Sequence, residues 1–376
     1  MLKILIVPDS FKGSLSAKEA TEAIAAGLSA SRDDLEIEKL PFSDGGEGAF
    51  ELLTALELGK TAEVECRDPL GRTLKAPYFL FSENTSTWIE LSQASGLTLL
   101  KEEEQNPLKT STYGTGLQLK DALDRGIQKI FLGIGGSGTH DVASGIFIAL
   151  GGKLLNKEGK ELAASGEALI NCASINSENL HPALKDTEIV VACDVTNPLL
   201  GENGAAKTYA EQKGADSETI EKLEKATAKF ADLLEKEFGR RIKEIPGGGA
   251  AGGVSAGMKA IANAELKPGF EILSELAKLE KKIKNADLVI TGEGKTDAQS
   301  KHGKLPFKIA NLAKKHQKQV WLLAGAITLN KTELEKAGFS KWAAIKPGDM
   351  PLKEAQSRAF ELLKEKTETI FKETTI

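Results

Sequence analysis

Short apolar runs that each end in a polar, glycine-rich turn set the strongest limit on how this chain can fold. In "KILIV", residues 3–7, the four residues after Lys3 are all apolar, as expected of a strand that helices cover on both faces. The same pattern recurs in "KIFLGIG", "EIVVACDVTNP", "ADLVITGEGKTD" and "VWLLAGAI". Helix candidates lie between the runs, among them residues 16–28, with a capping box of Ser16 and Glu19, and residues 217–238. Strands that alternate with helices predict an α/β fold with mostly parallel sheets.

Length and charge limit the class of protein. A chain of 376 residues favours two domains, and an apolar content of 41% is enough for a well-buried interior. The net charge is -5 with both signs mixed along the chain, which argues against a partner that is nucleic acid or a membrane surface. Specific lysines, backbone N–H groups or a metal ion must therefore hold any anionic ligand.

Three cysteines, Cys66, Cys172 and Cys193, lie far apart without a CxxC pair, so neither a disulfide framework nor a zinc cluster is expected. The opening apolar run is too short for a signal peptide, and no apolar stretch of 18 residues could span a bilayer. These features predict a cytoplasmic protein.

Polar clusters follow the predicted strands at the edge where open α/β sheets bind ligands. In "GIGGSGTHD", residues 133–141, a glycine-rich turn between strand and helix can aim backbone N–H groups at an anion. Ser137 and Thr139 can add hydroxyl donors, and Asp141 can approach a metal or, more simply, cap the following helix. The alternative for any one glycine turn is that its glycines only permit a tight backbone turn and that no ligand binds there. The stretch "PGGGAAGG" from Pro246 fits a phosphate site and close helix packing equally well.

Acidic and basic side chains gather at the same strand ends. Carboxylates suit Mg²⁺, and lysines neutralise phosphate or carboxylate charge. Caps and surface ion pairs remain the alternative for any single acid. The four histidines do not form a metal set, although His140 could touch a ligand. The acids in question are Asp9, Asp44, Glu47, Asp194, Glu293 and Asp297, and the lysines are Lys12, Lys213, Lys295 and Lys304.

Standard nucleotide and hydrolase motifs do not fit. "VITGEGKT" misses the P-loop pattern because Val289 occupies the first glycine position. A GxGxxG match at Gly133, Gly135 and Gly138 lacks a ribose-binding acid at the expected spacing. No GxSxG elbow supports a covalent hydrolase mechanism.

Taken together, the strings "PDSFKGSLSA", "SDGGEG", "STYGTG", "GIGGSGTHD", "ACDVTNPLLGENGAA", "EQKGA", "PGGGAAGG" and "TGEGKTDAQSKHGKLP" resemble the glycerate kinase family of the bacterial type-I class. The resemblance keeps their order and covers essentially the whole chain. It implies an ATP-dependent kinase of D-glycerate that uses Mg²⁺, built of two α/β domains around a cleft that holds the active site. One domain, flavodoxin- or Rossmann-like, would be discontinuous, with residues 1–64 and 286–376, and residues 65–285 would form the inserted domain.

The chain departs from the family pattern at a few positions. The family more often reads Ser-Ala-Thr-Asn-Asp-Gly-Gly where residues 137–143 of this chain read Ser-Gly-Thr-His-Asp-Val-Ala. Lys295 stands where an arginine is usual, and Ala210 and Glu211 replace a Gly-Pro. Lys295 keeps the charge but loses the bidentate reach of arginine, so these changes bear on substrate affinity more than on the reaction class.

Strand-end placement then suggests roles for individual residues. Asp194 is expected nearest the reacting hydroxyl or its Mg²⁺, with Asp44 as the competing acid, and Lys12 is expected to neutralise phosphate or the glycerate carboxylate. The expected metal ligands are Asp194, Glu293 and Asp297. The expected substrate- and phosphate-binding residues are Ser10, Gly135, Gly136, Ser137, Thr139, Lys213, Gly247, Gly248, Gly249 and Lys295.

Some alternatives stay open. The resemblance favours 2-phosphoglycerate over 3-phosphoglycerate as the product, and a monomer or a homodimer is expected. The glycine turns also allow a nicotinamide-dependent hydroxy-acid oxidoreductase. A further alternative is a non-catalytic protein that uses the cleft to sense a small anion.

Overall fold

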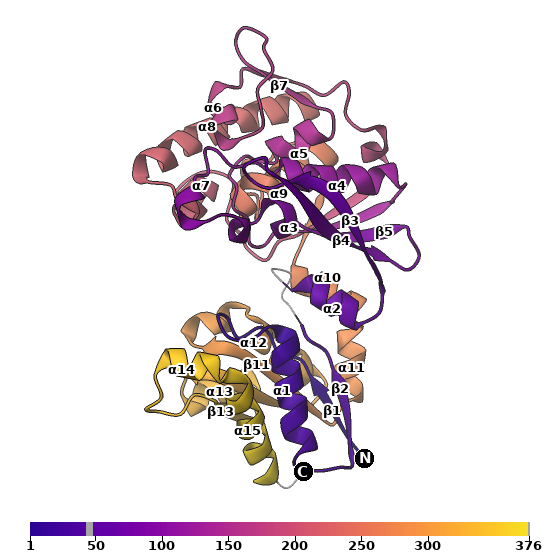
Figure 1. The fold of residues 1–376 in the computed structure, drawn as a ribbon, viewed down its shortest axis with the longest axis vertical. Helices are drawn as coiled ribbons and strands as arrows, with labels where there is room; N and C mark the ends of the chain where they lie inside the picture. The colour runs from indigo at the N-terminus through magenta and orange to yellow at the C-terminus, as the bar shows by residue number, and fades with distance from the viewer. Residues whose placement is uncertain (43–47, 375–376) are drawn as a thin grey trace. The chain divides into compact units, whose positions relative to one another are not determined.

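The computed structural model describes residues 1–42 and 48–374, and the chain folds as two compact units (Figure 1). Unit 1 comprises Met1–Asp44, Glu51–Glu57 and Phe270–Ile376, and unit 2 comprises Gly45–Phe50 and Leu58–Gly269. The domain boundaries expected from the sequence, at residues 64–65 and 285–286, stay a prediction.

Unit 1 is built on a parallel sheet of five strands in the order β13-β12-β11-β1-β2. Counted within the unit, this order is 2-1-3-4-5, the doubly wound arrangement of flavodoxin-like folds. The mostly parallel α/β architecture predicted from the alternating pattern is confirmed. The strands are β1 (Leu2–Ile6), β2 (Leu35–Lys39), β11 (Leu288–Thr296), β12 (Gln319–Ile327) and β13 (Lys341–Ala344).

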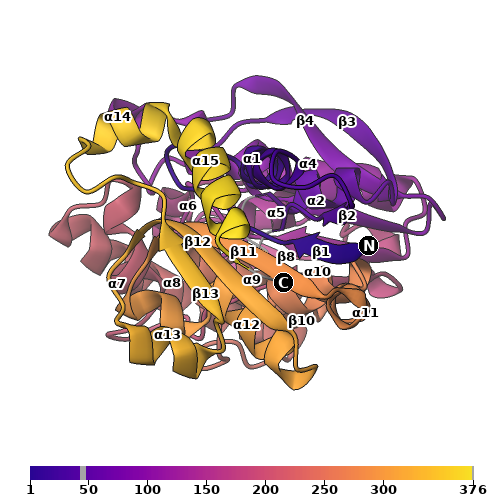
Figure 2. The same cartoon turned by 90° about the horizontal axis from the view of Figure 1, so that it is seen from below.

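Helices cover both faces of this sheet. Figure 2 shows α1 (Ala17–Ser29) and α15 (Ala359–Lys372) on one face, with α12 (Leu305–Lys315) and α13 (Lys331–Ala337) on the other. The predicted capping box is present, since the Ser16 side chain accepts from the Glu19 N–H and Glu19 accepts from the Ser16 N–H. The remaining helices of the unit or its borders are α2 (Ala49–Ala55), α10 (Gly269–Leu276), α11 (Leu279–Asn285), α14 (Leu352–Ser357) and the 3₁₀ turn η5 (Ala298–His302).

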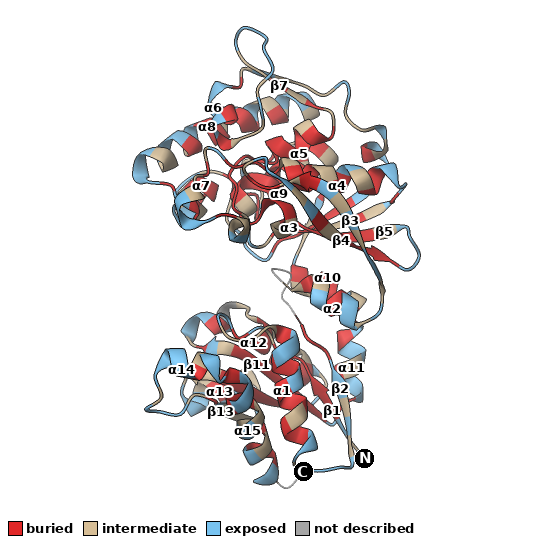
Figure 3. Ribbon diagram, viewed as in Figure 1, coloured by how far each residue is buried: buried red, intermediate tan, exposed pale blue. Residues whose placement is uncertain are grey.

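The central strands of unit 1, β1, β11 and β12, are buried from both sides, whereas β2 and β13 at the edges are partly exposed (Figure 3). Ile4 and Ile6 pack against α1 and α15 with Ile24 and Leu363, while Leu5, which points to the opposite face, is equally buried. Burial on both faces explains why "KILIV" does not alternate between apolar and polar side chains, as a half-exposed strand would.

Unit 2 has a six-stranded sheet in the order β10-β9-β6-β5-β4-β3. The strands from β5 to β10 run parallel, while β3 and β4 pair antiparallel at the other end, and the order follows the sequence without reversal. A separate antiparallel pair is formed by β7 (Lys153–Leu155) and β8 (Ser174–Asn176). The six strands are β3 (Gly59–Arg67), β4 (Thr73–Phe81), β5 (Ser86–Glu90), β6 (Lys129–Gly133), β9 (Glu188–Ala192) and β10 (Glu265–Lys267).

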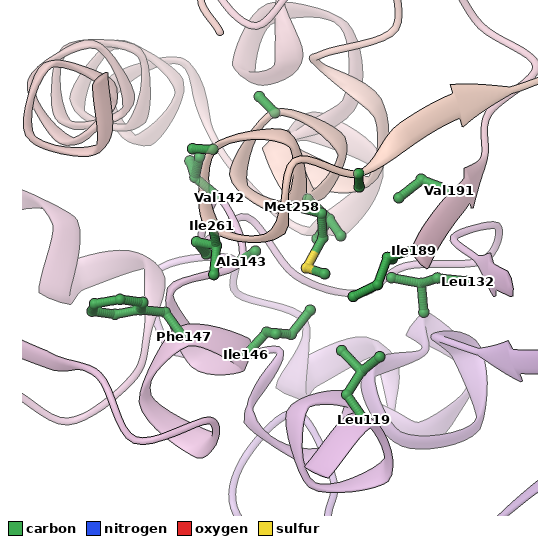
Figure 4. Packing of buried hydrophobic residues seen from close by; sticks show 14 of the residues in the cluster. Leu119, Leu132, Val142, Ala143, Ile146, Phe147, Ile189, Val191, Met258 and Ile261 are labelled. Carbon is green, nitrogen blue, oxygen red and sulfur yellow. The ribbon is translucent and has the colours of Figure 1, made fainter. Parts of the chain in front are cut away.

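The core of unit 2 lies between this sheet and its helices. Figure 4 shows Met258 and Ile261 of α9 packed among Val142, Ile146 and Ile189. The helices are α3 (Ser92–Ser95), α4 (Tyr113–Asp124), α5 (Ser144–Ala149), α6 (Gly166–Asn171), α7 (Ala205–Tyr209), α8 (Ser217–Phe238) and α9 (Ala250–Ala262). The 3₁₀ turns are η1 (Leu97–Leu99), η2 (Glu102–Glu104), η3 (Pro182–Lys185) and η4 (Glu211–Lys213).

The three cysteines are buried and form no disulfide. Within the described residues, no helix has the length and apolar character needed to cross a membrane.

Candidate functional site

Unit 1 contains a pocket of about 520 Å³ at the carboxyl ends of its strands. The loop after β1 contributes Ser10 and Lys12, and the end of β11 contributes Glu293 and Lys295. Four sequence-predicted site residues from two distant parts of the chain therefore line one pocket. Its other lining residues include Asp9, Phe11, Ser14, Gly294, Lys304, Gly325, Ala326, Ile345, Lys346 and several residues of α14 and α15.

Glycines of "TGEGKTD" allow the elements of this pocket to approach each other closely. A Cβ atom at Gly292 would lie 2.3 Å from the carbonyl oxygen of Leu323 in β12, and one at Gly294 would lie 3.1 Å from the backbone nitrogen of Lys12. The Asp9 N–H donates to the Gly292 carbonyl oxygen at 2.9 Å, which fixes the start of the β1 loop against β11. Close backbone packing therefore accounts for these glycines.

Glu293 and Asp297 lie in unit 1 with different surroundings. The Glu293 side chain is buried, and its carboxylate accepts from Thr296 Oγ1 at 2.9 Å and pairs with Lys304 Nζ at 3.2 Å. Asp297 caps η5, accepts from the Gln299 N–H and pairs with Lys295 Nζ at 3.1 Å. The hydrogen bond from Lys295 holds the pKa of Asp297 below its ordinary value. Each acid is held by a lysine: Glu293 by Lys304, which precedes α12, and Asp297 by Lys295 of β11.

In unit 2, the 133–141 loop is held by a buried lysine. Lys213 Nζ donates to Ser137 Oγ at 2.8 Å and to the Thr139 carbonyl oxygen at 2.7 Å, and its side chain is only 1% exposed. Burial lowers the pKa of Lys213 to about 7, and the nearby Asp141 opposes that shift. Three predicted site residues are thus in direct contact, and Gly135 and Gly136 belong to the same loop.

Asp141 acts as the structural cap that the sequence suggested as the simpler interpretation. Its carboxylate is fully buried, accepts from the Thr112 N–H at 2.8 Å and the Thr112 hydroxyl at 2.9 Å, and also accepts from the Gly145 N–H in the first turn of α5. Burial raises its pKa, while these hydrogen bonds act in the opposite direction. Thr112 is a partner that the sequence analysis missed, since no short-range pattern connects it with Asp141.

His140 belongs to the interior. Its Nε2 lies 3.0 Å from Thr227 Oγ1 of α8, and burial, with a smaller contribution from Lys213, lowers its pKa to about 3. The ring is therefore neutral near pH 7 and packs beneath the loop rather than facing solvent.

The "PGGGAAGG" turn packs directly on this loop. Ala251, Gly252 and Gly253 have positive φ, and a Cβ atom at Gly252 would lie 2.3 Å from the Thr139 carbonyl oxygen. The N–H groups of Gly248 and Gly249 donate to the carbonyl oxygens of Ile245 and Asn197. Close packing accounts for these contacts, and the phosphate-binding role of Gly247, Gly248 and Gly249 stays a prediction.

Asp194 directly follows β9, one strand away from the 133–141 loop in the sheet. Its side chain is exposed, and Oδ2 accepts from the Gly269 N–H at 3.0 Å. The competing acid, Asp44, lies outside the described residues. Across residues 1–42 and 48–374, no group of three or more His, Cys, Asp or Glu side chains is arranged to hold a metal ion by itself.

The sequence analysis missed one wall of the unit 1 pocket. Leu352, Ala355 and Gln356 of α14, with Ala359 and Leu362 of α15, line the pocket as well. The sequence pattern did not identify β13, and α14 and α15 are the helices that follow that strand. The exposure of Leu352 is the structural signal that identifies it.

Both units therefore place charged and hydroxyl side chains at the carboxyl ends of parallel strands. This arrangement defines a two-unit α/β protein of the class that handles small anionic ligands. Comparison with known proteins identifies the group within that class. The sequence profile of the Glycerate kinase family matches residues 4–375, so the chain belongs to the glycerate kinase family.

Individual relatives agree over most of their length. The Glycerate kinase of Halalkalibacterium halodurans is 39% identical, with 98% of this chain and 97% of that protein aligned. The Glycerate 2-kinase of Escherichia coli K12 is 42% identical over 87% of this chain and 86% of its own length. A crystal structure from Salmonella typhimurium LT2 superimposes with a TM-score of 0.86 at 39% identity, covering 98% of this chain and 97% of that chain.

Proposed function

We propose that this protein transfers the γ-phosphoryl group of ATP to D-glycerate, with 2-phosphoglycerate favoured as the product. One observation carries the proposal: the chain belongs to the glycerate kinase family and is 42% identical to a Glycerate 2-kinase over 87% of its length. Neither the oxidoreductase nor the sensor alternative receives support from the comparisons.

Phosphoryl transfer depends mainly on positioning the two substrates and neutralising their charge. The lysines, hydroxyl groups and carboxylates at the two sheet edges are sufficient for both tasks. Lys12 and Lys295 in unit 1 would neutralise phosphate charge, assisted there by Ser10. In unit 2, Ser137 and Thr139 with Gly135 and Gly136 would bind substrate on a loop held by Lys213. Asp194 would act nearest the reacting hydroxyl, and Asp44 remains the competing acid.

The chemistry of the donor groups in unit 1 fits Mg²⁺. Asp9 and Glu293 both line the pocket and supply the hard oxygen atoms that Mg²⁺ prefers. Mg²⁺ in kinases takes only one or two carboxylates and completes its shell with phosphate oxygens and water. A site without three clustered acids is therefore compatible with it. Bound Mg²⁺ would neutralise charge on the transferring phosphoryl group, and Glu293, Asp297 and Asp194 are the candidate acids.

The assay that tests the reaction couples ADP release to glycerate phosphorylation. We expect turnover with D-glycerate, ATP and Mg²⁺, and ³¹P NMR of the product should show the phosphate on carbon 2. A panel of other small hydroxy acids, run in parallel, establishes the range of acceptors. No ADP release with any acceptor, despite tight ligand binding, would favour the sensor, and reduction of NAD⁺ would favour the oxidoreductase.

Asp194→Asn tests the catalytic acid, and Asp186→Asn is its matched control. Both aspartates are exposed and flank β9, but Asp186 lies at the amino end of the strand and Asp194 at the carboxyl end. We expect D194N to lose ~100-fold or more in kcat, the usual contribution of a positioned acid or base. D186N should be unchanged. Near-normal turnover of folded D194N would remove Asp194 from the mechanism.

A cytoplasmic location is part of the proposal, because the reaction consumes ATP. A monomer or homodimer stays the expectation for the oligomeric state, and light scattering measures it directly.

A further inference from the structure

The pocket of unit 1 lies where the strand order of its sheet reverses. The chain moves from β1 outward to β2 on one side, and from β11 through β12 to β13 on the other. In open α/β sheets, ligands bind in the crevice beyond the carboxyl ends at such a reversal. Asp9 to Ser14 follow β1, and Glu293 to Lys295 end β11, so the pocket is lined from both sides of it. The sheet of unit 2 has no reversal.

One side of the pocket is strongly cationic. Lys12, Lys295 and Lys304 all line it. Glu293 pairs with Lys304, and Asp297 pairs with Lys295, so two of the three cations already have acidic partners. A ligand with several negative charges, or one that arrives with a divalent cation, suits this mixture of lysines and carboxylates.

A second part of the lining is mostly apolar. Ile345 and Leu362 line it with Leu352, Ala355 and Ala359, and Lys346 and Gln356 are the polar residues there. Leu352 is 64% exposed and lines the pocket, so it leaves apolar surface that a ligand could cover. A three-carbon hydroxy acid is polar throughout and has no apolar face to cover such a wall.

A nucleotide matches both sides, because it joins a flat, largely apolar base to a chain of phosphates. The volume of about 520 Å³ also lies in the usual range for ligands of that size. We propose that the unit 1 pocket binds the nucleoside triphosphate, with its base against the α14–α15 wall and its phosphates toward Lys12, Lys295 and Lys304. This inference rests on the proposed kinase activity and assigns one of its two substrates to one unit. Ser137 and Asp194 of unit 2 are then left for the hydroxy acid.

Leu352→Ser and its control Phe360→Ser test the apolar wall. Both residues are large, exposed hydrophobic side chains on neighbouring helices, at 64% and 40% exposure, but only Leu352 lines the pocket. Binding of MgADP to the full-length protein is measured by calorimetry without glycerate. We expect L352S to raise the Kd about fivefold, since it removes the contact of one partly exposed leucine with the base. F360S should stay within twofold of the wild type.

Photolabelling locates the base directly. The probe is 2-azido-ADP with Mg²⁺, followed by peptide mapping, and excess ATP serves as the competitor. Label within residues 345–362 that ATP suppresses supports the assignment. Suppressible label within residues 133–140 or 245–253 of unit 2 overturns it, as does an unchanged MgADP Kd in folded L352S. Absence of suppressible label from every peptide also overturns it.

The ADP-release assay separates this inference from the proposed function. If glycerate phosphorylation proceeds normally while label falls in unit 2, the activity stands and the location of the nucleotide is wrong. If no acceptor supports ADP release, the proposed function fails whatever the labelling shows.

Discussion

The Nζ atom of Lys213 lies 2.8 Å from the Oγ atom of Ser137, and a fully buried lysine thereby holds a partly exposed serine. A buried ammonium is costly unless several oxygens accept its protons. Here the Thr139 carbonyl oxygen is the second acceptor, at 2.7 Å. The contact joins η4 to the loop after β6, two segments separated by more than seventy residues. The shape of the glycine-rich loop is thus set from outside the loop.

Lys213→Met should change how stability depends on pH. Burial lowers the pKa of Lys213 to about 7, below the value of about 10.4 for lysine in an unfolded chain. Between these values the unfolded chain binds more protons, so the wild type gains stability as the pH rises from 7 toward 10. Lys213→Met lacks this contribution. Urea unfolding at pH 6.5 and pH 9 should therefore show the wild type gaining stability relative to K213M as the pH rises.

The same variant reports on the loop. Without the hydrogen bonds to Ser137 and Thr139, we expect the KM for glycerate to rise in K213M while the Kd of MgADP is unchanged. Lys207→Met is the control, because Lys207 lies on the preceding helix and pairs with the exposed Glu202. A pH profile of stability identical in K213M and the wild type would contradict the buried-lysine interpretation.

His140→Asn should make the protein less sensitive to acid. The pKa of His140 is about 3 in the fold, below the ordinary 6.5, so the wild type loses stability as the pH falls from 6.5 toward 3. At pH 5 this contribution is on the order of 2 kcal/mol. Asparagine, the residue more usual in the family at this position, does not titrate. When the pH is lowered from 7 to 5, the urea concentration at the unfolding midpoint should fall less in H140N than in the wild type. His316→Asn is the control, because His316 is less buried and pairs with Glu280. This variant should lose as much stability as the wild type when the pH falls from 7 to 5.

Gly252→Ala should disrupt the contact between the two glycine-rich segments. Gly252 has φ +65°, and a Cβ atom there would lie 2.3 Å from the Thr139 carbonyl oxygen. We expect a loss of about 3 kcal/mol or more in the free energy of unfolding, since both the backbone conformation and the packing oppose the substitution. Gly239→Ala is matched in φ, at +68°, but has open space around it and should cost about 1 kcal/mol. Equal losses in the two variants would show that packing at Gly252 has no special importance.

Local patterns in the sequence predicted the parts of the fold that depend on local physics. The apolar runs became the central strands β1, β6, β9, β11 and β12, and the Ser16–Glu19 capping box begins α1 as expected. The same helix packs closely on α15 at Gly27, where a Cβ atom would be 2.4 Å from the Lys364 carbonyl oxygen. These features are set within a strand, a turn or one helix face, so they can be inferred from residue spacing.

Long-range contacts explain what the sequence could not provide. Nothing near Lys213 in the chain indicates that the 133–141 loop buries it, and nothing links Asp141 to Thr112. The apolar wall from α14 and α15 was missed because its position depends on how the end of the chain packs on α1. The glycines of "TGEGKTD" and "PGGGAAGG" were singled out as candidates for ligand binding, and backbone packing between segments accounts for them without a ligand.

Glu293→Gln should weaken the response to Mg²⁺. The carboxylate is buried at the pocket, accepts from Thr296 and pairs with Lys304. Glutamine keeps the shape but removes the charge, so a cation held beside it loses one hard anionic ligand. We expect the Mg²⁺ concentration for half-maximal activity to rise about tenfold or more, since altering metal-site residues commonly costs that much. Titration of ADP release with Mg²⁺ measures this concentration.

Glu280→Gln is the control, because Glu280 is another lysine-paired glutamate of unit 1 but does not line the pocket. This variant should leave the titration unchanged. If E293Q and E280Q give the same Mg²⁺ titration, Glu293 serves only to hold Lys304 and the end of β11.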